Sequence, residues 1–147
     1  MIKTILVAVD GSAHAKKAVK LASEIAIKCD ARLIIVNVIK SAELPESLRD
    51  FTDVKSIKGP PPAVLRRAAG KVIDEARSRA RGAGVSDVRT KVLKGSPERM
   101  IVDYARKKHA DMIVMGSRGL GDVEGMLLGS ISRSVGLLAD CPCLTVK

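Results

Sequence analysis

The sequence contains no tryptophan and only one tyrosine and one phenylalanine among its 147 residues. Proteins that bind single-stranded nucleic acid usually stack the bases on aromatic side chains, so this scarcity argues against that function. The cysteines number three, which favours reduced thiols over a disulfide framework or a tetrahedral zinc site. No hydrophobic run reaches the length of a membrane span, and the first residues lead directly into a strand pattern. We therefore expect a cytoplasmic protein without a membrane partner.

The net charge is +10, and its position in the chain matters more than its size. Residues 55–109 contain 15 basic and 5 acidic side chains, so this part of the chain carries the whole excess. One interpretation is a surface that binds a polyanion, and the other is the solvated surface of ordinary helices. We favour the second, because the basic residues fall mainly on two helices that the predicted topology places on opposite faces of the sheet. Nucleic acid is therefore not an expected partner.

Short apolar runs alternate with helix-length amphipathic segments along the chain. Nearly continuous apolar runs predict strands that are covered on both faces, and an alternating run predicts an exposed edge strand. The expected strands are residues 2–9, 33–38, 88–93, 112–115 and 143–146. The expected helices are residues 12–29, 63–81, a third that opens at Ser96, Pro97 and Glu98, and 130–138.

This order of elements predicts an α/β fold, a three-layer doubly wound parallel sheet of five strands in the order 3-2-1-4-5 with helices on both faces. We expect residues 1–147 to form a single domain. Ligands of such sheets bind outside the carboxyl ends of the strands, where the strand order reverses. Here the reversal lies between the first strand, which ends before Asp10, and the fourth, which ends near Gly116.

Residues 40–62 contain Pro45, Gly59 and three consecutive prolines, and they have no clear period. A connection of this length is unusual in a compact domain, so we predict a long flexible insertion. It leaves the carboxyl end of the second strand, beside the expected crevice. A lid or partner-binding segment and a simple mobile insertion both remain open.

Glycines follow the fourth strand and precede the last helix. Two residues separate Gly116 from Gly119, and nine residues separate Gly119 from Gly129. Glycine lets backbone N–H groups approach an anion, and a helix N-terminus adds donors and a partial positive charge. The pattern predicts a phosphate site at Ser130, which lacks the preceding lysine of a Walker motif because Gly129 stands there.

With these motifs the chain resembles the universal stress protein family, in particular its ATP-binding branch, over essentially its whole length. The resemblance rests on residues 5–12, 111–119, 127–132 and 141–146 and on the glycine spacing. It implies a stress-response protein that binds ATP or another adenine nucleotide, with Mg²⁺ or Mn²⁺, as a switch or sensor with at most slow hydrolysis. It also implies a homodimer, for which the final strand offers a sheet edge.

The resemblance further implies which residues contact the nucleotide. They are Ala8, Asp10, Val38, Met115, Gly116, Arg118, Gly119, Gly129, Ser130, Ile131 and Ser132. Asp10 would reach the ribose or the base, and Val38 would offer backbone groups to adenine. Asp10 can alternatively close only a turn before the first helix.

Gly116 and Gly119 would let the chain pass close to the ribose and phosphates. Gly129, Ser130 and Ser132 would hold the phosphates with N–H and hydroxyl groups, although Ser130 can instead be an ordinary helix cap. Met115 and Ile131 would give apolar contact or belong to the core, and Arg118 would neutralise phosphate or remain solvated.

Two carboxylates lie in the loop between Gly119 and Gly129, where they would repel a triphosphate unless a cation intervenes. These residues, Asp122 and Glu124, can face solvent or help to hold Mg²⁺. We assign no catalytic residue, and His14 and His109 are expected at the surface. Two other functions stay open: a metal-dependent nucleotide hydrolase, and a basic interaction or adaptor domain with a vestigial nucleotide site.

Overall fold

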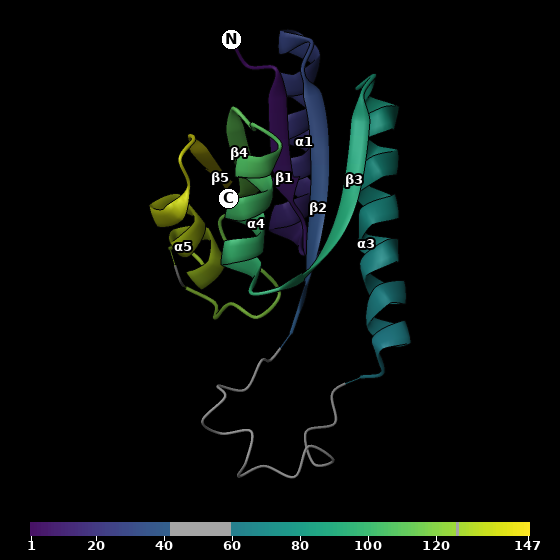
Figure 1. Ribbon diagram of the computed structural model, residues 1–147, viewed down its shortest axis with the longest axis vertical. Coiled ribbons are helices and arrows are strands. Elements are labelled where there is room, and N and C mark those ends of the chain that lie inside the picture. Colours follow the sequence, from purple (N-terminus) through teal and green to yellow (C-terminus); the bar gives the residue numbers. More distant parts are fainter. Residues whose placement is uncertain (42–59, 126) are drawn as a thin grey trace.

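The computed structural model describes residues 1–41, 60–125 and 127–147 and contains one five-stranded parallel sheet. The sheet has the order β3-β2-β1-β4-β5, which confirms the predicted α/β class and strand order (Figure 1). The strands are β1 (Thr4–Ala8), β2 (Arg32–Lys40), β3 (Val88–Gly95), β4 (Met112–Gly116) and β5 (Cys143–Val146). Of the predicted insertion, residues 42–59 lie outside the described residues.

Four described helices cover the two faces of this sheet. They are α1 (Ala13–Cys29), α3 (Pro62–Ala83), α4 (Pro97–Lys107) and α5 (Ser130–Leu138). One apolar cluster joins α1 and α3 to one face, and a second joins α4 and α5 to the other (Figure 1). The basic helices α3 and α4 thus lie on opposite faces, as predicted. None of the described helices combines the length and the apolar character that a membrane crossing requires.

The central strands explain why helices are needed on both sides. Ile5, Leu6 and Val7 are consecutive in β1 and are all fully buried, although alternate side chains of a strand point to opposite faces. β1 pairs with β2 and β4 at the same time, with Ile5 opposite both Leu33 and Met112. The sequence pattern of an uninterrupted apolar strand is therefore matched by burial in the middle of the sheet.

The ends of the helices agree with the expectations at α1 and differ from them in detail at α3 and α4. Ser12 caps α1 through a hydrogen bond from the Ala15 N–H to its hydroxyl, at 3.2 Å. α3 continues through Gly82 and ends where Gly84 takes a φ of 107°, in the left-handed region that favours glycine. Ser96 precedes α4, but its hydroxyl donates to the Glu98 carboxylate, which holds the pKa of Glu98 below its usual value.

Candidate functional site

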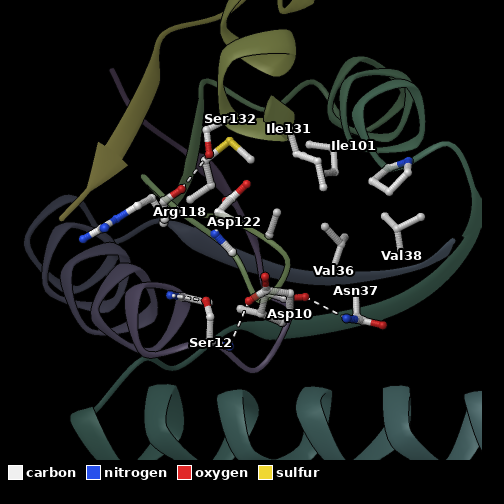
Figure 2. Close-up of a pocket in the computed structure, with 17 residues that line it drawn as sticks. Asp10, Ser12, Val36, Asn37, Val38, Ile101, Arg118, Asp122, Ile131 and Ser132 are labelled. Carbon is white, nitrogen blue, oxygen red and sulfur yellow. Dashed lines mark hydrogen bonds between the residues drawn. The ribbon is translucent and has the colours of Figure 1, made fainter. Parts of the chain in front are cut away.

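A cavity lies at the carboxyl ends of β1, β2 and β4, at the point where the strand order reverses, and the first turns of α4 and α5 border it. Figure 2 shows the cavity with its lining side chains. The lining residues are Ala8, Val9, Asp10, Ser12, Ala15, Val36, Asn37, Val38, Pro97, Ile101, Met115, Gly116, Arg118, Gly119, Asp122, Ile131 and Ser132. Sequence segments about a hundred residues apart therefore meet in one crevice, as expected for a doubly wound sheet.

All the contact residues predicted from the sequence line this cavity except Gly129 and Ser130. Gly129 is buried beside the Asp122 carboxylate, and Ser130 is exposed. Ser130 is the first residue of α5 and Gly129 is the N-cap residue, so Ser130 does not have the alternative role of helix cap. The structure thus brings the predicted residues to one place, and their contacts with a nucleotide remain a prediction.

Asp10 ties the end of β1 to the glycine loop. Its Oδ1 accepts a hydrogen bond from the Ser12 N–H at 2.9 Å, which is the turn considered as the alternative role of this residue. Its Oδ2 accepts a second hydrogen bond, from the Leu120 N–H at 3.0 Å. Asp10 therefore holds the loop that follows β4 in place through the Leu120 N–H, and this role does not depend on contact with a ligand.

The exit of β4 is held by three hydrogen bonds to neighbouring elements. The Ser117 N–H donates to the Val146 carbonyl at 2.7 Å, and the Gly129 N–H donates to the Ser117 carbonyl at 2.6 Å. The Ser132 hydroxyl donates to the Gly116 carbonyl, also at 2.7 Å. These bonds fix the start of α5 against β4, and they engage two groups, the Gly129 N–H and the Ser132 hydroxyl, to which the family resemblance gave a role in phosphate binding.

The N-terminus of α5 keeps free donors beside the cavity. Its N-cap residue is a glycine, and no side chain in the described part of the protein caps the helix. The first backbone hydrogen bond of the helix is that of Arg133 N–H to the Gly129 carbonyl. The N–H groups of Ser130, Ile131 and Ser132 precede it in the first turn, and none of them has a partner among the residues that the structure describes. Such a helix end attracts anions through its donors and its partial positive charge.

Asp122 points into the cavity, whereas Glu124 is exposed. The Asp122 Oδ2 accepts a hydrogen bond from the Gly119 N–H at 2.5 Å. The same carboxylate lies against Gly129, where an added Cβ would collide with it. Figure 2 shows it on the side of the cavity that carries Ser132. Of the two loop carboxylates, only Asp122 therefore contributes charge to the site.

Arg118 lines the cavity, but the end of its side chain is directed toward His14. Its Nη2 lies 3.4 Å from the Nε2 of His14, and Figure 2 shows the guanidinium group directed away from Asp122. His14 was expected to be a surface residue, but it is half-buried and packs against Gly116. His14 and Gly116 are about a hundred positions apart, so no local sequence pattern indicates that His14 packs against Gly116.

Several lining residues were not predicted from the sequence. They are Val9, Ser12, Ala15, Val36, Asn37, Pro97 and Ile101. Asn37 is buried, and its amide donates to the Val9 carbonyl at 2.7 Å, which joins the ends of β1 and β2. A signal for it existed, because Asn37 is the single polar residue in the apolar run 33–38. The described residues form no cluster of three or more histidine, cysteine or acidic side chains suited to a metal ion.

A parallel sheet of this order, with a partly apolar cavity at its switch point, defines the protein as a doubly wound α/β domain. A family model described as the universal stress protein family matches residues 1–147. The chain belongs to the universal stress protein family.

Individual relatives agree with this assignment. A universal stress protein of Thermus aquaticus is 39% identical over 147 residues, which is the whole of both chains. The structure of UspA from Lactobacillus plantarum has a TM-score of 0.79 at 26% identity and covers 99% of this chain and 98% of that one. A universal stress protein solved in complex with cAMP has a TM-score of 0.73 at 30% identity, with coverages of 99% and 97%.

Proposed function

We propose that this protein binds an adenine nucleotide in the cavity at the ends of β1 and β4, with ATP and Mg²⁺ or Mn²⁺ as the physiological ligand. It acts as a nucleotide-dependent switch or sensor in the stress response, with at most slow ATP hydrolysis. The similarity to a relative solved with cAMP supports a nucleotide ligand. All three cysteines are free thiols, which suits a cytoplasmic location.

The observation that carries the proposal is the division of the cavity into an apolar and a polar side. Figure 2 shows Val36, Val38, Ile101 and Ile131 together on one side. A nucleobase needs such a surface, because its faces are apolar. Figure 2 shows Arg118, Asp122 and Ser132 on the other side, from the glycine loop and the first turn of α5, and the N–H donors of these segments suit phosphate.

Binding is tested on the purified full-length protein by denaturing extraction with nucleotide analysis, and by melting after removal of bound nucleotide. ATP with Mg²⁺ at about 100 times its dissociation constant is expected to stabilise the protein by about 2.7 kcal/mol. For a chain of this size that corresponds to a rise in melting temperature of roughly 5–10 °C. GTP, with the same phosphates, is the control for recognition of the base. No shift with millimolar ATP, ADP or AMP would contradict the proposal.

We also propose that the protein forms a homodimer through the free edge of β5. The carbonyls of Pro142 and Val146 accept hydrogen bonds from Ile113 and Ser117 of the β4 side. Because the backbone groups of a strand alternate in direction, the N–H and carbonyl of Thr145 point away from β4. Thr145 is also exposed, so the outer edge is open to a strand of a second copy.

Substitution Thr145→Pro removes the outward N–H and leaves the bonds to β4 in place, since proline has no backbone donor. We expect this variant to sediment as a monomer at concentrations at which the wild-type protein is a dimer. Thr145→Val retains the N–H and is expected to remain a dimer. A dimer that survives Thr145→Pro, or a monomeric wild-type protein, would show that β5 is not the interface.

A further inference from the structure

One carboxylate of the chain itself fills the space between the two glycines that bound the phosphate loop. The Asp122 Oδ2 accepts the Gly119 N–H, and the same carboxylate lies against the Cα of Gly129. The donor on Gly119 is one that the glycine pattern offers to a phosphate. In the structure the chain supplies its own anion at that place.

The Asp122 carboxylate and a phosphate oxygen would compete for the same donor, the Gly119 N–H. A backbone N–H has a single hydrogen to donate, so a phosphate that takes the Gly119 N–H displaces the carboxylate. Where the carboxylate remains nearby, it repels the ligand in proportion to the charge of the phosphate chain. Arg118 forms no ion pair with this carboxylate in the described part of the chain, and its guanidinium lies at His14.

We propose that Asp122 is a specificity residue that sets how much phosphate charge the pocket accepts, given the nucleotide binding proposed above. In the absence of a divalent cation it disfavours a triphosphate against a monophosphate. A bound Mg²⁺ or Mn²⁺ offsets the charge of Asp122 and of the phosphates together. Asp122 contacts the loop rather than the base, so it does not discriminate between nucleosides.

The test compares the binding of adenosine, AMP and ATP in EDTA by calorimetry, for the wild-type protein and Asp122→Asn. Two charges about 10 Å apart at an effective dielectric of about 20 interact by an amount equivalent to roughly a tenfold change in affinity. We therefore expect Asp122→Asn to bind ATP about tenfold more tightly, AMP about threefold more tightly, and adenosine within a factor of about two.

Glu124→Gln is the matched control, because it removes the same charge from the same loop at an exposed side chain. It is expected to change ATP affinity by less than a factor of about two, since exposed charges are screened. Asp122→Ala, which also removes the acceptor for Gly119, should show the same order of gains as Asp122→Asn.

Four results would overturn the assignment of Asp122. The first three are equal changes for all three ligands, an equal gain for ATP in Glu124→Gln, and no gain for ATP in either Asp122 variant. A loss of adenosine binding in both Asp122 variants also overturns it, because the residue would then support only the shape of the loop. Failure of the wild-type protein to bind any of the three ligands, with or without Mg²⁺, refutes the proposed function itself and this inference with it.

Discussion

Alanine in place of Gly116 is expected to lower the free energy of unfolding by about 2–3 kcal/mol. A Cβ at this position would lie 2.8 Å from the Cβ of His14, 2.9 Å from its carbonyl carbon and 3.0 Å from the Ala15 nitrogen. These atoms belong to or adjoin the backbone of α1, which cannot move aside as the end of a side chain can. α1 or β4 must shift, and the buried sheet centre beneath them resists this.

Urea denaturation followed by circular dichroism measures the change. Gly121→Ala is the control, since a Cβ there would meet no atom of the described residues within 4 Å. Its stability is expected to stay within about 0.5 kcal/mol of the wild-type value. Equal stabilities of Gly116→Ala and Gly121→Ala would show that the contact with His14 does not determine the choice of glycine.

Loss of the Asp10 carboxylate is expected to weaken nucleotide binding about 30-fold, as measured by ATP titration of Asp10→Ala. The carboxylate accepts hydrogen bonds from the N–H groups of Ser12 and Leu120. Bonds to a charged acceptor contribute about 1.5–3 kcal/mol each, and partial exposure reduces that figure, so about 2 kcal/mol is expected in total. The released loop must then be ordered again by the ligand, which costs affinity.

Asp10→Asn tests how much of the effect comes from losing both hydrogen bonds of the Asp10 carboxylate rather than one. Its single amide oxygen can keep one of the two hydrogen bonds, so its affinity is expected to lie between those of the wild-type protein and Asp10→Ala. Unchanged far-ultraviolet dichroism would show that both variants remain folded. Wild-type affinity in Asp10→Ala would exclude a role for the β1 end in holding the glycine loop.

The arrangement of the sheet was predictable because the evidence for it is local. The uninterrupted apolar segments of β1, β2 and β4 require cover on both faces, and alternating helices supply that cover through right-handed crossovers. Few strand orders satisfy both conditions. The start of α1 at Ser12 was also predictable, because a helix cap bonds to a backbone N–H only three positions further along the chain.

The positions of side chains within the cavity were less predictable, because they depend on contacts across the fold. The glycine spacing predicted a phosphate site between Gly119 and Gly129, but it does not reveal that the Asp122 carboxylate contacts both glycines. The sequence was equally compatible with an Arg118 guanidinium that faces the cavity, whereas the structure places this group beside His14. The sequence shows that Asn37 is a polar residue in an apolar run, but it does not show that the Asn37 amide donates a hydrogen bond to the Val9 carbonyl.

The sequence by itself determined the class of fold, the edge of the sheet at which the cavity lies and the elements that meet there, because hydrophobic periodicity and chain connectivity restrict the possible topologies so strongly. Only the tertiary structure decided which groups at that edge are free and which are engaged. A hydrogen bond such as that of Leu120 to Asp10 joins residues 110 positions apart. No local pattern encodes such a pairing, since it exists only when the strands have brought both residues to the same place.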